Sequence, residues 1–224
     1  MNDKQLVALH AAKLVKDGML VGLGTGSTAN FFIEELARRQ REEGLRVTTV
    51  ASSVVSTLKA QQLGLHVVAM EHISRIDLYV DGADEITPDL TLLKGRGFDL
   101  VREKLLARAA DQFIVVADRS KLVSRIGEKF PIPIEVIPYA WQLAKWTLEG
   151  LGGEGDLRKN GDGLTMTSHG SLVLDMQFDP DLDAAMLAAA LSATPGVVEH
   201  GIFSGLASSV LIAADGQIEE RRAP

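Results

Sequence analysis

The chain contains no cysteine, which excludes disulfides, thiolate zinc sites and a cysteine nucleophile. Its five histidines are scattered without the spacing of metal ligands, so we expect no metal site. No apolar run approaches the ~18 residues that a membrane helix needs, and the N-terminal segment lacks a signal-peptide pattern. We therefore expect a cytoplasmic protein with no membrane partner.

A broad basic surface is also missing. The chain has 23 Lys and Arg against 30 Asp and Glu, and the net charge of −7 disfavours nucleic acid as a partner. A small anionic ligand remains possible, because its site needs only a few local positive groups. The 224 residues, 46% of them apolar and 24% charged, are typical of a globular protein with one large domain or one and a half.

Acidic residues gather where a predicted strand ends. Apolar residues at 76, 78 and 80 predict a strand over 76–80, and Asp81, Asp84 and Glu85 follow it within five positions. Acids also cluster in simple turns, and Asp-Gly is a common turn pair. The pattern alone thus fits either a turn or a site for proton transfer.

A lysine and a glutamate follow in the same stretch. Lys94 ends the next apolar run, and Gly95 and Gly97 flank Arg96. Glu103 lies in a predicted helix over residues 98–110 and has apolar neighbours at helical spacing, which would raise its pKa toward that of a general base. A surface glutamate paired with a cation is the alternative for this position. Together the acids, lysine and glutamate favour proton-transfer chemistry on a small anionic substrate.

A glycine-rich loop, Gly22 to Thr28, connects a short apolar run to a predicted helix over residues 29–39. Backbone N–H groups at such a junction can hold a phosphate, and the hydroxyls of Thr25, Ser27 and Thr28 could add donors. The loop matches neither the G-x-G-x-x-G dinucleotide pattern nor the Walker pattern. A tight turn without a ligand is the alternative.

Strands and helices alternate through the first part of the chain. Besides those already named, we expect helices at 3–16 and 54–63 and strands at 19–21, 46–50, 66–69 and 113–117. This order predicts an α/β fold with a doubly wound, Rossmann-like parallel sheet, whose ligands bind at the carboxyl ends of the strands. Those ends include Gly24 to Thr28, Asp81 to Asp84 and Lys121. They also include Ser52 and Ser53, and Ser53 fits either a helix N-cap or a substrate contact.

The sequence pattern changes at residue 130, where an alternating apolar run contains several prolines. We predict strands at 132–136, 164–167, 172–176 and 197–203 and helices at 139–149 and 181–193. This β-α-β-β-α-β order predicts a smaller α+β, ferredoxin-like domain. We expect residues 1–128 plus 206–224 to form the Rossmann-like catalytic domain, with the chain returning at 210–213, and residues 129–205 to form the small domain.

Several motifs in fixed order carry a resemblance to a known family. They are V-G-L-G-T-G-S-T-A (21–29), A-S-S (51–53), Y-V-D-G-A-D-E-I (79–86), L-K-G-x-G (93–97), R-E-K (102–104), A-D-x-S-K (117–121), K-F-P-I-P-I-E-V-I-P (129–138) and P-G-V-V (195–198). Each is weak alone, but together they are specific. Along nearly its whole length the chain resembles ribose-5-phosphate isomerase type A.

The resemblance implies interconversion of ribose 5-phosphate and ribulose 5-phosphate in the non-oxidative pentose phosphate pathway, without cofactor or metal. It implies that Glu103 is the catalytic base and that Asp81, Asp84 and Lys94 are also catalytic. The implied substrate-binding residues are Thr25, Gly26, Ser27, Thr28, Asp81, Gly82, Ala83, Asp84, Lys94, Gly95, Arg96, Gly97 and Lys121. Lys4 matches a phosphate-facing basic position more loosely. We also expect a homodimer, and Ile202, Phe203 and Leu206 fit either a subunit contact or the core.

The chain departs from the family pattern in two places. Arg96 replaces the middle glycine of K-G-G-G, and could point to solvent or place a cation near the sugar. Residues 167–171 read T-S-H-G-S where T-D-N-G-N is common. Two other activities fit the scaffold: another sugar-phosphate enzyme, such as a glucosamine-phosphate deaminase-like protein or a lactonase, and a non-enzymatic sugar-phosphate sensor.

Overall fold

The computed structural model describes residues 2–223, which form two compact units. Unit 1 holds residues up to 83, residues 102–121 and residues from 205 onward, and unit 2 holds residues 84–101 and 122–204. The predicted domains, residues 1–128 plus 206–224 and residues 129–205, remain a prediction. Within residues 2–223 the structure has no helix with the length and apolar character required to cross a membrane.

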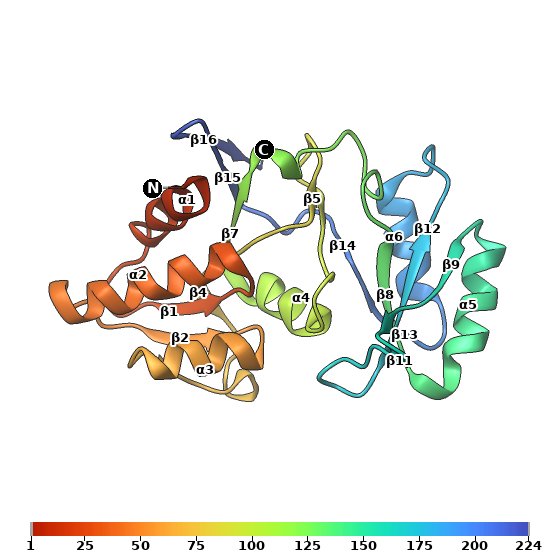
Figure 1. Cartoon of the computed structure of the whole chain (residues 1–224), viewed down its shortest axis with the longest axis horizontal. Coiled ribbons are helices and arrows are strands. Elements are labelled where there is room, and N and C mark those ends of the chain that lie inside the picture. Colours follow the sequence, from red (N-terminus) through yellow and green to blue (C-terminus); the bar gives the residue numbers. More distant parts are fainter. Residues whose placement is uncertain (1, 224) are drawn as a thin grey trace. The chain divides into compact units, whose positions relative to one another are not determined.

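Unit 1 is built on a seven-stranded sheet in the order β16-β15-β7-β4-β1-β2-β3 (Figure 1). All neighbours pair in parallel except β15 and β16, which are antiparallel. The predicted Rossmann-like sheet is therefore confirmed. Its elements are α1 (Asp3–Ala12), β1 (Leu20–Leu23), α2 (Ser27–Glu43), β2 (Thr48–Ala51), α3 (Val54–Gln62), β3 (His66–Val67), η1 (Met70–His72), β4 (Ile76–Asp81), β7 (Ala110–Asp118), η2 (Arg119–Lys121), β15 (Ser209–Ala214) and β16 (Gln217–Arg222).

The core of unit 1 follows from the alternation of its strands. Side chains of β1, β4, β7 and β15 that point to one face pack with α1, α2 and Ala60 of α3 in a single apolar cluster. On β4 and β7, Tyr79 and Phe113 stack with their ring centroids 4.8 Å apart. Both aromatic rings are fully buried, so the strands that carry the acidic cluster are anchored by packing.

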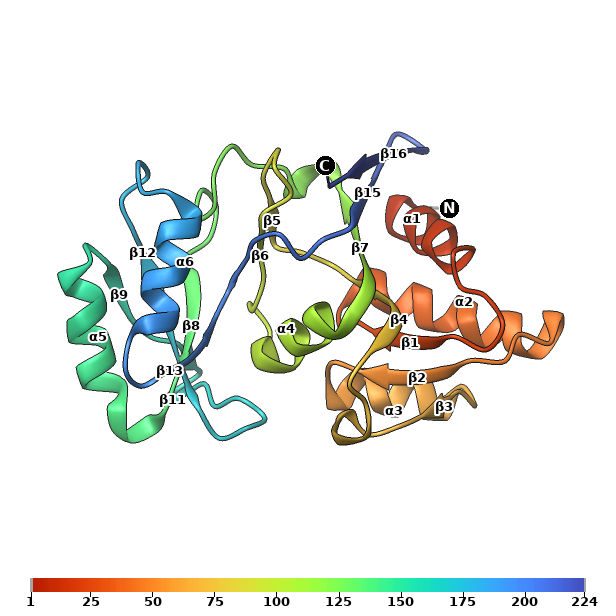
Figure 2. The ribbon, with the colours of Figure 1, turned by 180° about the vertical axis from the view of Figure 1, so that it is seen from behind.

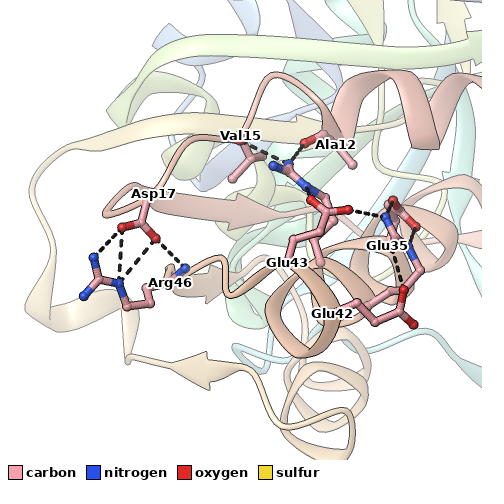
Figure 3. A network of polar contacts seen from close by, with 9 residues as sticks. Ala12, Val15, Asp17, Glu35, Glu42, Glu43 and Arg46 are labelled. Atoms are coloured by element: carbon pink, nitrogen blue, oxygen red, sulfur yellow. Dashed lines mark hydrogen bonds and ion pairs between the residues drawn. The ribbon is translucent and has the colours of Figure 1, made fainter.

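Polar contacts fix the far end of α2, where the chain turns into β2 (Figure 3). Arg39 of α2 donates to the backbone oxygens of Ala12 and Val15, just after α1, with the second bond at 3.1 Å. Arg46 pairs with Asp17 at 2.6 Å, which joins the segments before β1 and β2. These contacts hold the end of the sheet opposite to the glycine-rich loop.

Unit 2 has a four-stranded antiparallel sheet in the order β13-β8-β12-β9, with α5 and α6 packed on it (Figure 2). A second sheet joins β14, β6 and β5. The helix α4 (Leu100–Ala109) begins in unit 2 and continues in unit 1. The other elements are β5 (Glu85–Ile86), β6 (Leu92–Leu93), β8 (Ile132–Val136), η3 (Pro138–Ala140), α5 (Trp141–Gly150), β9 (Glu154–Leu157), β10 (Lys159–Asn160), β11 (Gly163–Leu164), β12 (Leu172–Gln177), α6 (Ala184–Ala193), β13 (Val197–His200) and β14 (Ile202–Phe203).

The ferredoxin-like order is confirmed, but two predicted strands were placed wrongly. The second strand of the four is β9, not residues 164–167, and its exposed side chains gave no apolar alternation to read. The strand predicted at 197–203 is divided at Gly201 between two sheets. A Cβ at Gly201 would lie 2.4 Å from the carbonyl oxygen of Lys94, so the chain passes β6 closely at this point.

Candidate active site

The strand order of unit 1 reverses between β1 and β4, because β2 lies beyond β1 and β7 lies beyond β4. Such a switch point opens a crevice at the carboxyl ends of the two strands, where ligands of open α/β sheets bind. The glycine-rich loop leaves β1 here, and Asp81 ends β4. The two segments are joined by a hydrogen bond of 2.9 Å from the Gly24 N–H to the Val80 carbonyl oxygen.

Asp81 is fully buried and accepts hydrogen bonds from neighbouring groups of unit 1. Its donors include the Thr25 N–H at 3.1 Å, the Gly82 N–H at 2.7 Å and the Tyr79 hydroxyl at 2.5 Å. A buried carboxylate needs such donors to replace the water it has lost. A Cβ at Gly24 would lie 2.2 Å from the Asp81 carboxylate, so only glycine fits beside it.

Glu103, on α4, is buried, with 7% of its surface exposed. Burial, followed by the negative charges of Asp81 and Glu103, raises the pKa of Tyr79 well above its usual value. Tyr79 therefore stays neutral and donates to Asp81, with the charge of Glu103 close enough to act on it. The structure brings Asp81 and Glu103 together around this tyrosine, and the alternative of a surface glutamate is wrong.

The glycine-rich loop leads directly into α2. Gly26 is the N-cap residue, with φ of 112°, and no side chain among the described residues caps the first turn of this helix. The N–H groups of that turn and the positive end of the helix dipole therefore form a site suited to an anion. The predicted phosphate-binding loop thus has the backbone geometry that phosphate binding requires.

One lysine contacts this loop, and a second lysine acts on the same carboxylate as the first. The Lys4 ammonium donates to the Ser27 hydroxyl at 3.0 Å, which supports the looser assignment of Lys4. At the end of β7, burial raises the pKa of Asp118, but hydrogen bonds from Ser120 and the charges of Lys121 and Lys4 outweigh it, so the pKa is lowered. Both lysines therefore act on the same carboxylate, and Lys4 can add positive charge for an anion at the loop.

The Thr25 side chain forms hydrogen bonds within unit 1. Its hydroxyl donates to Ser53 at 2.7 Å and lies 2.9 Å and 3.1 Å from the hydroxyls of Ser52 and Ser56. Since its N–H donates to Asp81, Thr25 holds the loop against neighbouring segments. Ser53 caps α3 by accepting from the Ser56 N–H at 3.1 Å, so the N-cap interpretation is confirmed.

In unit 2 the other predicted residues lie around the segment that follows β6. The Asp84 N–H donates to the Leu93 carbonyl oxygen at 2.8 Å, and its carboxylate accepts from the Arg96 N–H at 3.3 Å. Lys94 is 4% exposed, and its ammonium lies 5.8 Å from the centre of the Phe203 ring. Asp84 directly precedes β5 and Lys94 directly follows β6, so both are held at the same end of two neighbouring strands of one small sheet.

Arg96 is exposed, as the first of its two expected positions requires, and it also contacts an aromatic ring. Its guanidinium lies over the Phe130 ring, 3.8 Å from the ring centre. Among the described residues the non-glycine positions with positive φ are Leu90 and Asp215, so Arg96 adopts an ordinary backbone conformation. The backbone conformation at position 96 therefore does not require glycine. At Gly95 it does favour glycine, because φ there is 96°.

Several polar residues that the motifs left unassigned complete the surroundings. Glu85, the third acid of the cluster, is fully buried and accepts from the N–H groups of Gly127, Lys129 and Phe130, so its role is to fix that loop. Arg158, missed by the sequence analysis, donates to the carbonyl oxygens of the 95–97 segment. No single-residue signal in the sequence would have indicated it.

The predicted residues are thus distributed over both units. Thr25 to Thr28, Asp81 to Ala83, Glu103 and Lys121 belong to unit 1, and Asp84 and Lys94 to Gly97 belong to unit 2. The chain itself connects the two sets, because Asp84 directly follows Ala83 and α4 carries Glu103 five residues after Phe98. Within residues 2–223 no three or more His, Asp and Glu side chains are grouped in a way that could hold a metal ion.

Comparison with known proteins assigns the family. Residues 48–217 match the family model for ribose 5-phosphate isomerase A (phosphoriboisomerase A). A ribose-5-phosphate isomerase A of Methanothermobacter thermautotrophicus is 46% identical over 94% of this chain and 93% of its own. That of Gloeobacter violaceus is 44% identical over 96% of this chain and 94% of its own.

Solved structures agree with this assignment. The ribose 5-phosphate isomerase A of Methanocaldococcus jannaschii superposes with a TM-score of 0.93 at 39% identity, over 98% of both chains. A D-ribose-5-phosphate isomerase in complex with phospho-erythronic acid superposes with a TM-score of 0.94 at 34% identity, over 99% of this chain and 100% of its own. The chain therefore belongs to the ribose 5-phosphate isomerase A family, and it is an enzyme that interconverts ribose 5-phosphate and ribulose 5-phosphate.

Proposed function

We propose that Glu103 is the base that moves the proton between C2 and C1 of the open-chain sugar phosphate. Removing the C2 proton of the aldose gives an enediolate, and returning a proton at C1 gives the ketose. One carboxylate can serve both steps, because it takes up the C2 proton and donates a proton at C1, and its proton can exchange with solvent between the two steps. The burial of Glu103 supports this role, since a carboxylate shielded from water is a stronger base than an exposed one.

Lys94 stabilises the negative charge that develops on the sugar oxygen, which is the role of a preorganised cation in a site with little water. Asp81 moves the hydroxyl proton between the two oxygens and assists ring opening. Asp84 orients the sugar hydroxyls, together with the backbone of Gly82, Ala83 and the 95–97 segment.

The phosphate is held by the first turn of α2, by Lys121 and by Lys4, with Thr25 to Thr28 forming the loop. Binding energy at the phosphate positions carbons that lie far from it. We expect Lys121→Ala to raise KM for ribose 5-phosphate while leaving kcat nearly unchanged, as steady-state kinetics would measure. An unchanged KM would contradict the role of Lys121.

The observation that carries the proposal is the position of two buried carboxylates, Asp81 and Glu103, around Tyr79 next to the anion-binding loop. Glu103→Gln keeps the shape and removes the base, so we expect kcat to fall by ~10²–10⁴. The assay mixes the protein with ribose 5-phosphate and EDTA and follows ketose formation. Glu71→Gln, at an exposed position, is the matched control. Near-normal turnover in Glu103→Gln would refute the assignment.

We also propose that the enzyme is a cytoplasmic homodimer with no nucleic-acid or membrane partner and works in the pentose phosphate pathway. The negative net charge supports the absence of a nucleic-acid partner. Ile202 and Phe203 are buried within the chain, so they belong to its core and leave the dimer contact to other residues. Light scattering on the purified protein tests the dimer, and a monomer at micromolar concentration would contradict it.

A further inference from the structure

Arg158 follows β9 and is fixed in place by its own backbone. Its N–H donates to the Val173 carbonyl oxygen at 2.8 Å, and its carbonyl oxygen accepts from the Thr165 N–H at 2.8 Å. Its side chain is 14% exposed. Because its backbone N–H and carbonyl oxygen are both hydrogen-bonded and its side chain is mostly buried, Arg158 has little conformational freedom to contact other groups.

One edge of the Arg158 guanidinium faces a carboxylate. Its Nε donates to Asp175 Oδ2 at 2.8 Å and its Nη2 donates to Asp175 Oδ1 at 2.6 Å. This two-point pairing fixes the plane of the guanidinium as well as its position. Asp175 lies on β12, in the middle of its pairing with β8 and β9, so the carboxylate is anchored by the sheet.

The remaining nitrogen faces the segment after Lys94. Nη1 donates to the carbonyl oxygens of Gly95 at 3.0 Å, Arg96 at 3.3 Å and Gly97 at 3.1 Å. Three successive carbonyl groups directed at one cation define the path of the whole segment. From the other side, the Asp84 carboxylate accepts the Arg96 N–H at 3.3 Å.

We propose that Arg158, oriented by Asp175, is a positioning residue that fixes the 95–97 segment and through it the Lys94 side chain. This rests on the proposed function of Lys94. The positive charge of Arg158 is used entirely on Asp175 and backbone oxygens, so the residue acts through the segment and needs no contact with the sugar. Lysine cannot replace it, because a single ammonium cannot satisfy the paired carboxylate and three carbonyl groups in one plane.

The first test compares Arg158→Met, which keeps the length, with Arg158→Lys. A displaced catalytic group costs up to ~10²-fold in rate, so we expect both variants to lower kcat by about 10- to 100-fold. KM for ribose 5-phosphate should change less than about threefold, because the proposed phosphate contacts lie elsewhere. Arg125→Met is the matched control, since Arg125 lies in the same unit and its Nη1 donates to the neighbouring Ile126 carbonyl oxygen at 3.4 Å.

Two further measurements separate positioning from a general structural role. Arg158→Met should lower kcat tenfold or more in the normal protein and less than twofold in a Lys94→Ala background, because the lysine it positions is gone. Added guanidinium ion should partly restore turnover to Arg158→Gly, and should not do so for Lys94→Ala. If Arg158→Met does not fold, Asp175→Asn and Arg158→Lys carry the same comparison.

The inference is overturned if Arg158→Met and Arg158→Lys keep kcat within twofold of normal, or if the loss is equally large with and without Lys94. The proposed function fails separately, if Glu103→Gln and Lys94→Ala turn over normally. Inactive Glu103→Gln and Lys94→Ala beside a normal Arg158→Met would therefore remove the inference and leave the proposed function intact.

Discussion

The glycine-rich loop after β1 and the one after β6 differ in why they contain glycine. In the first, a Cβ at Gly24 would meet Asp81 at 2.2 Å, so glycine is demanded by the neighbouring carboxylate. In the second, Gly95 needs its positive φ of 96°, but the next position accepts Arg96 in an ordinary conformation. The two glycine-rich loops thus tolerate side chains at different positions. In each loop, a glycine is required where a neighbouring atom lies too close for a Cβ or where φ is positive.

The largest expected effect is that of Gly24→Ala. The added methyl would lie 2.2 Å from the Asp81 carboxylate oxygen and 2.6 Å from the Asp81 α-carbon, and neither can move without displacing β4. We expect a loss of about 3 kcal/mol in the free energy of unfolding, and a fall in kcat/KM of at least ~100-fold from the displaced Asp81. Urea unfolding and steady-state kinetics measure both. Full activity would mean that the close approach is unimportant.

Thr25→Val should come next, because it removes the hydroxyl that ties the first loop to Ser52, Ser53 and Ser56. Losing these hydrogen bonds among buried hydroxyls costs about 1–3 kcal/mol, and a loosened loop should raise KM for the phosphorylated sugar. Thr147→Val, which removes a hydroxyl bonded to the Leu143 carbonyl oxygen on an exposed helix, is the control. Equal stability of the two variants would argue against the proposed tie.

Gly95→Ala tests the second loop. A side chain with φ near 96° is strained, and its Cβ would lie 3.0 Å from Leu100 Cδ1. We expect a loss of about 1–2 kcal/mol in the free energy of unfolding. Gly150→Ala has open space and no positive φ, so thermal unfolding of that variant gives the reference. If Gly95→Ala is as stable as Gly150→Ala, the positive φ of Gly95 does not require glycine, and positions 95 and 96 do not differ in this respect.

The smallest effect belongs to Arg96→Gly, which restores the glycine of the family motif. The variant loses the contact with the Phe130 ring, about 0.5–1 kcal/mol at a partly exposed site. We expect kcat/KM to stay within about threefold, because the carbonyl oxygens that Arg158 binds remain. A tenfold fall in kcat/KM would show that Arg96 contacts the substrate, and that the residue at position 96 matters for activity.

Much of this organisation was readable from the sequence, because it depends on local patterns. Apolar runs ending in Asp81 and in the glycine-rich loop predicted the strand ends, and their meeting at the switch point follows from the parallel sheet. The order of motifs predicted the family. The glycine-rich loop between a strand and a helix, the position of Asp81 at a strand end and the helix of Glu103 were therefore predicted.

Other features depend on contacts between distant residues and left no local pattern. β9 is an exposed strand whose side chains do not alternate, so its position was missed. Arg158 and Thr25 are ordinary polar residues until the fold brings Asp175 and the serine hydroxyls to them. The division of the strand at Gly201 depends on the approach of Lys94, more than one hundred positions earlier in the chain.

The central claim is that Glu103 carries the proton between the two sugar carbons. Running the reaction in D₂O and following deuterium at C1 of the ribulose 5-phosphate by NMR tests it most directly. We predict that the normal enzyme incorporates solvent deuterium during turnover and that Glu103→Gln, at equal concentration and with its fold confirmed, does so at least ~10²-fold more slowly. Exchange by Glu103→Gln within a few-fold of the normal rate would contradict the account.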